Sequence, residues 1–408
     1  MGENTNCKLW NKDFILLLQG TGVSSFGDIL YSVAIGYWVY EKTGSNALMG
    51  IMSSITSFVV MLLSPFSGSI IDKIDRKFVI VGMDVVRGFI MMFAGIMAYS
   101  EKLTVSMVLI CAFLASIGTV FFNPAVDTTF IDIIPHHDMV RGQSVANGVK
   151  SFITLIGKAL SGTLVAFFGV GFIIVFNGIC YFLSAITELF ISVPKTAQQG
   201  EKVTVKSLIH DMKIAITVIF DDRFLKLFVP FVLLVNLLAS GPMALKLPFV
   251  MNKGLSVDFY GYLMAIETAG SLLGILFLSF FQLKSNVRYL LMSFGYLLSG
   301  IFYIIGYLSN SGSIIIVMCF IGSLGNAVGN LIFNASLMLA LPDKNRGAII
   351  GFINSCSVGG CAISAVIFGV LCDLFSISYV FAVGTLISLI LLVQFCFNQS
   401  TREFVQNH

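Results

Sequence analysis

The chain alternates between long apolar runs and short polar segments, and this alternation predicts its secondary structure. About twelve runs reach roughly 20 residues, the length that a helix needs to cross about 30 Å of hydrocarbon. Backbone polar groups in lipid need partners within their own segment, so every run is expected to be helical. The predicted spans are 14–40, 47–71, 78–99, 104–130, 144–168, 171–193, 224–241, 259–281, 287–308, 312–340, 347–371 and 376–397.

Composition agrees with this pattern. Hydrophobic residues make up 57% of the 408 residues and charged residues only 11%, with a mean hydropathy of +0.94. A soluble domain carries about 25% charged residues, so this chain cannot cover itself with a polar surface. We therefore expect an all-α, multi-pass membrane protein. The polar start, Met1 to Asp13, leads directly into the first span, which predicts that no signal peptide is cleaved.

The distribution of Lys and Arg predicts the orientation. A charged turn between the second and third spans contains Asp72, Lys73, Asp75, Arg76 and Lys77. Its three cations place it on the cytoplasmic side. Only four of the 24 Lys and Arg residues then fall in outer loops: Lys42, Lys102, Lys246 and Lys253. Arg87 and Lys158 fall inside helices, and all others, including Lys150, fall in cytoplasmic segments. Both termini are therefore expected in the cytoplasm.

The longest connection divides the chain into two halves. It predicts an N-terminal six-helix bundle over 1–193, a cytoplasmic linker over 194–223 and a C-terminal six-helix bundle over 224–408. Apolar residues at helical spacing between Ser207 and Phe220 favour an amphipathic helix on the inner membrane surface, with an irregular linker as the alternative.

The two halves also resemble each other. Phe122-Asn123 and Phe333-Asn334 both lie in the fourth helix of their half, and each pair is followed by a proline and an Arg-Gly step. Weak internal repeats of this kind are typical of transporters, in which the substrate binds near mid-membrane between the repeats.

Three ionisable residues fall near the middle of predicted spans: Asp28, Lys158 and Glu267. A charge at this depth costs at least roughly 2.5–3.5 kcal/mol on insertion scales, so each needs a reason to be there. Polar residues share a helical stripe with Asp28 and another with Lys158, so both stripes are expected to face protein or water. We predict that Asp28 or Glu267 carries a coupling proton. The alternative is a static Asp28–Lys158 ion pair that joins the first and fifth helices.

Four stretches carry a resemblance to a known family. Gly68, Asp72, Arg76 and Lys77 resemble the Gly-x-x-x-Asp-(Arg/Lys)-x-Gly-Arg-(Lys/Arg) signature of the major facilitator superfamily (MFS), although Asp75 replaces the commoner glycine. The other three resemble its macrolide-efflux and siderophore-export branch. They are Ser25-Phe26-Gly27-Asp28, Glu41-Lys42-Thr43-Gly44-Ser45 and Phe121-Phe122-Asn123-Pro124-Ala125. One departure is Gly157-Lys158, where exporters of this kind often have Gly-Pro in the fifth helix.

The resemblance implies the MFS fold and several site residues. In that superfamily the first, fourth, seventh and tenth helices line the cavity. The polar candidates there are Asn236, Asn326 and Asn330, with hydrogen bonds between helices as the alternative role. Aromatic candidates for an apolar cavity wall are Tyr31, Phe121 and Tyr260. Asp84 and Arg87, three residues apart on one helix face, are expected to join Asp72 and Arg76 in a cytoplasmic gate. Glu188, near the end of the sixth helix, is expected at the membrane interface.

These observations predict a secondary transporter rather than an enzyme. The resemblance implies proton-driven efflux of amphipathic drugs such as macrolides across a bacterial cytoplasmic membrane. An exporter of an endogenous siderophore or lipid is the alternative within the class, and a membrane receptor or membrane enzyme is the alternative outside it. The sequence shows no phosphate-binding loop and no recognised metal-ligand spacing, so we expect no ATP, cofactor or metal. The expected partners are protons, a small amphipathic substrate and membrane lipids, without nucleic acid, and the protein is expected to be a monomer.

Overall fold

The structure, a computed structural model, describes residues 9–71, 74–135, 138–192, 217, 219–220, 223–279, 285–340 and 346–398. Within these ranges the regular structure is helical and no strand occurs. The predicted amphipathic helix of the linker falls almost entirely on residues outside them, and so does Asp72.

The helices follow the predicted spans closely. Those of the N-terminal half are α1 (Lys12–Thr43), α2 (Asn46–Ile71), α3 (Arg76–Tyr99), α4 (Val105–Ile133), α5 (Met139–Phe168) and α6 (Val170–Glu188). Those of the C-terminal half are α8 (Arg223–Ala244), α9 (Lys246–Asn252), α10 (Val257–Ser279), α11 (Ser285–Leu308), α12 (Gly312–Ala340), α13 (Arg346–Leu374) and α14 (Ile377–Cys396). Among the described residues, eleven helices are long and apolar enough to cross a membrane, or up to twelve if a bent pair forms one span.

That bent pair is α8 and α9, and here the prediction was wrong. The sequence placed residues after 241 in an outer loop, but the chain continues as α8 to Ala244 and then as the seven-residue α9. The bend between them is 48°. Pro242 lies inside the last turn of α8, where a proline removes a backbone hydrogen bond and bends the helix.

The helices form two compact units. The first comprises Met1–Val39 with Val59–Val203, and the second comprises Tyr40–Phe58 with Thr204–His408. Thus the first part of α2, up to Phe58, packs with the second unit, although the sequence division grouped it with the first half. Asp373 of α13 explains this packing: its Oδ1 accepts from the Asn46 backbone N–H (2.7 Å) and its Oδ2 from the Ala47 N–H (3.1 Å).

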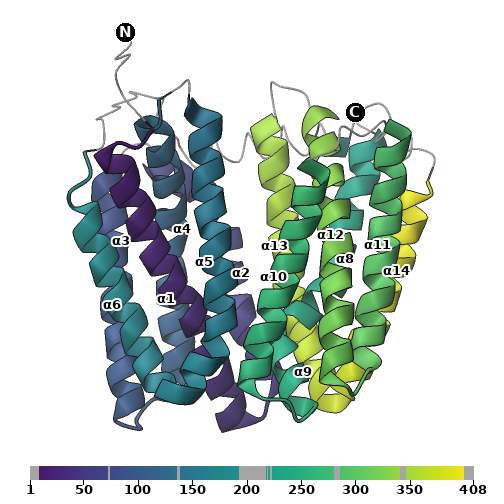
Figure 1. Cartoon of the computed structure of the whole chain (residues 1–408), viewed down its shortest axis with the longest axis horizontal. Helices are drawn as coiled ribbons and strands as arrows, with labels where there is room; N and C mark the ends of the chain where they lie inside the picture. The colour runs from purple at the N-terminus through teal and green to yellow at the C-terminus, as the bar shows by residue number, and fades with distance from the viewer. Residues whose placement is uncertain are drawn as a thin grey trace. The chain divides into compact units, whose positions relative to one another are not determined.

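In the first unit, α3 packs between α4 and α6 (Figure 1). An apolar core of the first unit includes the buried residues Phe14 of α1, Ile80 of α3 and Phe122 of α4. In the second unit, α12 packs against α10 and α11, and α8 packs against α13. Phe333 is buried in the core of that unit. The repeated Phe122 and Phe333 therefore both serve as core residues.

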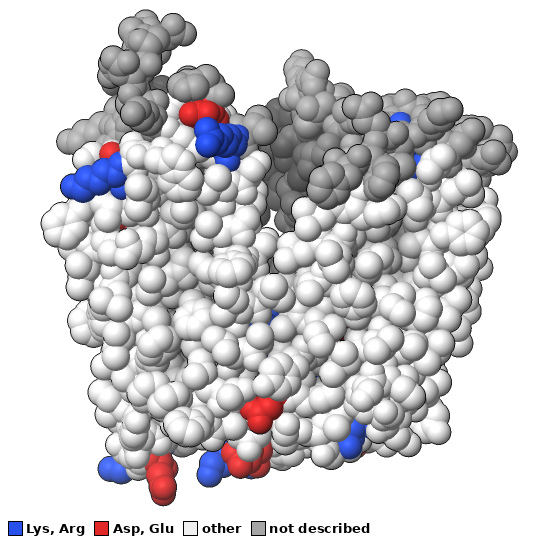
Figure 2. All heavy atoms as spheres, in the orientation of Figure 1, with Lys and Arg blue, Asp and Glu red and all other residues white. Residues whose placement is uncertain are grey.

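Charge is confined mainly to the ends of the helices. On the face shown in Figure 2, the described Lys, Arg, Asp and Glu side chains gather at the helix ends, and the surface between them is almost wholly uncharged. Many large apolar side chains are exposed within the helices, for example Phe89 at 65% and Phe93 at 49%, both in α3. Such a surface is stable in contact with lipid, which makes this a multi-pass membrane protein.

Candidate functional site

Ionisable side chains gather inside the first unit, although the helices around them are apolar. We call the set of Asp28, Asp84, Arg87, Tyr181 and Glu188 the charge cluster. It joins α1, α3 and α6. Since charged groups inside a membrane are costly, a cluster of them marks a candidate functional site.

Asp28 is held by two donors from α6. The Tyr181 hydroxyl donates to Asp28 Oδ1, and Asn177 Nδ2 lies 3.4 Å from the same oxygen. Gly27 allows this approach, because a Cβ at Gly27 would meet Asn177 Oδ1 and lie 3.0 Å from Cys180 Cβ. The neighbouring glycine thus brings α1 and α6 close enough for Asp28 to reach its donors.

Arg87 links the two ends of the cluster. Its guanidinium pairs with Asp84 one turn earlier on α3, and the two side chains are 2% and 0% exposed. Its Cζ lies 4.2 Å from the ring centroid of Phe122 and 4.4 Å from that of Tyr181. A cation over an aromatic face is attracted by the ring quadrupole. The same tyrosine therefore supports Arg87 with its ring and Asp28 with its hydroxyl.

Glu188 completes the cluster, and the prediction for it was wrong. It was expected at the membrane interface, but it is only 1% exposed within the protein. Ser184 Oγ, one turn earlier on α6, donates to Glu188 Oε1 over 3.1 Å. The α1 backbone approaches the same group, since a Cβ at Gly20 would lie 3.0 Å from Glu188 Oε1.

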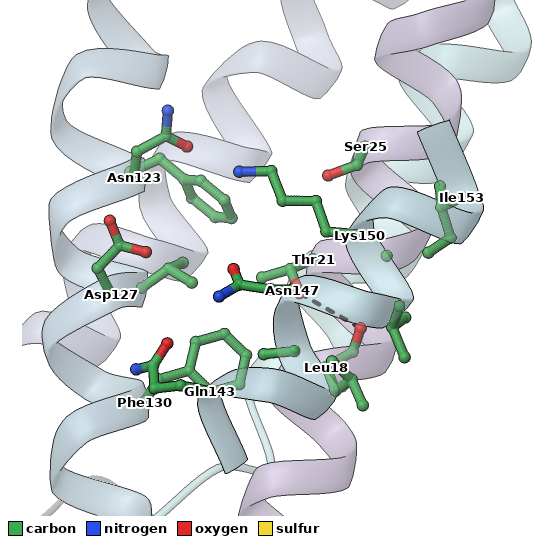
Figure 3. Close-up of a pocket in the computed structure, with 15 residues that line it drawn as sticks. Leu18, Thr21, Ser25, Asn123, Asp127, Phe130, Gln143, Asn147, Lys150 and Ile153 are labelled. Carbon is green, nitrogen blue, oxygen red and sulfur yellow. Dashed lines mark hydrogen bonds between the residues drawn. The ribbon is translucent and has the colours of Figure 1, made fainter. Parts of the chain in front are cut away.

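A polar cavity of about 180 Å³ lies within the first unit (Figure 3). Asn123 and Asp127 line it from α4, and Asn147 and Lys150 line it from α5, with their side chains directed inward. Thr21, Ser25 and Phe122 are also among the lining residues. Lys150 lies in α5, within the span predicted over 144–168, and its position on the cytoplasmic side stays a prediction. Of the polar stripe predicted on the first helix, Thr21 lines this cavity, whereas Asp28 contacts α6.

The second unit contains a separate buried ion pair. Lys246 Nζ lies 2.6 Å from both Oε1 and Oε2 of Glu267, and the two residues are 4% and 8% exposed. The prediction of Lys246 as an outer-loop cation was therefore wrong. Its Nζ also lies 5.8 Å from the ring centroid of Tyr303 on α11. Glu267 thus has a cationic partner on α9 that the sequence analysis missed.

The remaining polar candidates take part in helix packing. Asn236 Nδ2 donates to the Val232 carbonyl oxygen (2.9 Å), and its Oδ1 is 3.6 Å from Cys361 Sγ on α13. Asn330 Nδ2 donates to Asn326 Oδ1 (2.5 Å), and Asn330 Oδ1 accepts from the Tyr296 hydroxyl on α11 (2.9 Å). These contacts match the alternative role of joining helices, while a substrate role for these amides stays a prediction.

The aromatic candidates and Lys158 lie on helices of different units. Tyr31 and Phe121 belong to α1 and α4 of the first unit, and Tyr260 belongs to α10 of the second; all three are half-buried. Lys158 lies in α5, and the preceding Gly157 packs on Ile29 of α1, where a Cβ would be 3.1 Å from Ile29 Cγ2. Lys158 is thus near the level of Asp28, and their ion pair stays a prediction.

The signature turn is described only in part. Gly68 lies in the last turn of α2, and Asp75 caps α3 by accepting from the Lys77 backbone N–H (3.0 Å). Arg76 pairs with Asp132 of α4. Asp84 and Arg87 face each other as their spacing predicted, but both are fully buried in the charge cluster. The gating role of these residues stays a prediction.

Comparisons with known proteins agree with this architecture. The family model of the transmembrane secretion effectors matches residues 5–406. Macrolide efflux protein A of Streptococcus pyogenes is 23% identical over 214 residues, which are 52% of this chain and 53% of that protein. Macrolide efflux protein A of Enterococcus faecalis is 24% identical over 178 residues, which are 44% of this chain and 55% of that protein. The match thus spans about half the length of these relatives.

Solved structures show the same fold. A mutant of the nucleoside transporter NupG superposes with a TM-score of 0.76 at 13% identity, covering 94% of this chain and all of that one. A bacterial homologue of the iron transporter ferroportin gives a TM-score of 0.69 at 15% identity, covering 94% of this chain and 98% of the other. The chain belongs to the transmembrane secretion effector family, within the major facilitator superfamily of membrane transporters.

Proposed function

We propose that this transporter exports amphipathic compounds, macrolides among them, from the bacterial cytoplasm in exchange for protons. The observation that carries the proposal is Asp28, a carboxyl group in the middle of α1 that is hydrogen-bonded by Tyr181 and Asn177. A side chain of this kind can exist in both protonation states, because its donors satisfy the carboxylate and its apolar surroundings favour the neutral acid. Intramembrane ionisable groups commonly form proton relays in transporters.

Export follows the alternating-access scheme in this proposal. The six-helix bundles, residues 1–193 and 224–408, rock about a central site in a monomeric protein whose termini both face the cytoplasm. The direction of transport is supported by the macrolide efflux relatives, which match about half of the chain.

The polar cavity of the first unit contributes part of the substrate site in this proposal. Its amides and Lys150 can bind the hydroxyl and carbonyl groups of an amphipathic molecule. Drug-sized ligands occupy pockets of about 300–1,000 Å³. The cavity, at about 180 Å³, therefore holds only one polar portion of such a ligand.

The test is accumulation of a radiolabelled macrolide in bacteria that express the protein, with and without a protonophore. Lower accumulation than in empty-vector cells, abolished by the protonophore, is the expected result. Lys150→Ala is the matched test of the cavity, with Lys102→Ala as an exposed-lysine control. Accumulation equal to the control would contradict macrolide export, and siderophores and lipids would then be tested in the same assay.

A further inference from the structure

Two acidic residues of the charge cluster, Asp84 and Glu188, have a feature that the proposed function does not use. Asp84 Oδ2 and Glu188 Oε2 are both buried, and neither receives a hydrogen bond within the part of the chain that the structure describes. The packing of α3 on α6 brings the two carboxyl groups to the same level. The two helices run antiparallel, and a Cβ at Gly88, one turn after Asp84, would lie 2.9 Å from Phe182 Cε1, so Asp84 faces the turn of α6 that holds Glu188. Two carboxylates are acceptors only, so a contact between these groups is favourable only if one of them carries a proton.

The charges around the pair lead to the same conclusion. From α1 the cluster receives Asp28, from α3 Arg87, and from α6 the phenol of Tyr181, while α4 contributes the uncharged Phe122 to the contact with Arg87. Arg87 is thus the one cation of the cluster facing three carboxyl groups. If all three were ionised, the cluster would carry two uncompensated negative charges. Buried charges without partners are costly, and binding a proton removes that cost.

Arg87 carries a single positive charge and cannot neutralise both Asp28 and the Asp84–Glu188 pair. It is paired with Asp84, and it also lies within electrostatic range of Asp28. Ser184 supplies a single hydroxyl donor to Glu188. Within the described residues Glu188 thus has one side-chain donor and no ion pair, and Asp84 lies on the facing turn of α3.

We propose that Asp84 and Glu188 form a second proton-binding site, in which the two carboxyl groups share one proton between α3 and α6. The hydrogen bond O–H···O⁻ between them satisfies both unpartnered oxygens. The site communicates with Asp28 through Arg87: ionised Asp28 attracts the guanidinium and leaves the Asp84–Glu188 pair more dependent on its proton. The proposal makes two claims. The first, that the shared proton is present in the resting protein, is independent of the proposed function. The second, that this proton exchanges during export, rests on the proposed function.

Infrared spectroscopy tests the shared proton directly. The full-length protein is purified, reconstituted in nanodiscs and measured at neutral pH for the carbonyl stretch of a protonated carboxylic acid. The difference spectrum of wild type minus Glu188→Gln is expected to show this band. The amide introduced by Glu188→Gln can donate its N–H to Asp84, so this variant preserves the contact without the proton. Glu101→Gln, at an exposed glutamate, is the matched control and should show no such band.

Two further variants locate the proton. Asp84→Asn should remove the band as Glu188→Gln does, because either change leaves a single carboxyl group that accepts from an amide. Asp28→Asn should retain the band. A band unchanged by Glu188→Gln, or one lost only with Asp28→Asn, would overturn the proposal. Circular dichroism and size-exclusion profiles identify variants that misfold. If Glu188→Gln does not fold, Asp84→Asn replaces it in the difference spectrum.

A transport assay independently tests whether the shared proton exchanges during export. If the proton exchanges during export, macrolide export by Glu188→Gln should fall to the level that wild type shows with a protonophore. Export that keeps its full protonophore sensitivity would overturn the exchange claim while the infrared band still supports the shared proton. Failure of export in wild type would instead contradict the proposed function and leave the spectroscopic test intact.

Discussion

Lys246 Nζ lies 2.6 Å from each carboxylate oxygen of Glu267, and the pair is buried inside the second unit. The residues are 21 positions apart, on the short helix α9 and on α10. Glu267 therefore fixes the broken α8–α9 segment to α10. Glu267 can therefore stabilise the fold through this ion pair, in addition to the proton-coupling role predicted from sequence, and the two roles can be tested separately.

Removal of one member of the pair should destabilise the protein strongly. Glu267→Gln leaves Lys246 buried beside a neutral amide, and breaking a buried pair costs about 3–5 kcal/mol. The apparent Tm of the purified protein should therefore fall clearly. The double variant Lys246→Met with Glu267→Leu should recover most of the loss, because it removes both charges. If Glu267→Gln keeps the wild-type Tm and loses only pH-dependent export, the coupling role is supported instead.

Asp373 gives a second stability prediction. It accepts hydrogen bonds from the Asn46 and Ala47 backbone N–H groups and from Ser45 Oγ (3.0 Å). Asn46 and Ala47 begin the first turn of α2, and Ser45 directly precedes it. The N–H groups of a first helical turn have no partner within the helix. Loss of such a cap costs about 0.5–2 kcal/mol. Asp373→Ala should therefore accelerate hydrogen exchange at the first turn of α2.

The control for this prediction is Asp258→Ala, another acidic residue in a first helical turn, on α10. It should leave exchange at the start of α2 unchanged. Exchange in Asp373→Ala that equals wild type would show that the contact between α13 and α2 contributes nothing to the stability of that turn.

Gly27 tests how the close contact of α1 and α6 supports Asp28. A Cβ at this position would meet Asn177 and Cys180, so Gly27→Ala forces α1 and α6 apart or displaces Asn177. Overpacking of this kind costs about 1–3 kcal/mol. We expect a lower apparent Tm together with weaker export. Gly148→Ala is the matched control, since a Cβ there meets nothing within 4 Å. Equal behaviour of both variants would contradict the packing argument.

Hydropathy predicted most of the helices, because lipid requires every span to be apolar and to satisfy its backbone hydrogen bonds within the helix. The exception was α9, whose first residue, Lys246, looks like a loop cation. Its burial depends on Glu267 in another helix, and no local pattern indicates such a pairing. The contact between Asp84 and Arg87 was predictable because residues three apart meet on one helix face.

The partners of Asp28 could not be predicted in the same way. Asn177 and Tyr181 are four residues apart on α6, but helical spacing does not say which helix that face meets. Similarly, Glu188 lies at a helix end, where a glutamate usually reaches water. Only the close approach of α1 at Gly20 shows that it is enclosed. The sequence motifs were sufficient to predict the family, whereas the charge cluster could be recognised only from the three-dimensional arrangement of α1, α3 and α6.

The central claim is that Asp28 couples export to protons, and the most direct measurement uses reconstituted vesicles with an imposed pH gradient. Wild type and Asp28→Asn are compared for macrolide movement driven by the gradient and for macrolide binding without it. The substituted amide keeps the shape of the side chain and can still contact Tyr181. We expect Asp28→Asn to bind macrolide but no longer to respond to the gradient. Gradient-driven movement equal to that of wild type would show that Asp28 is not the coupling residue.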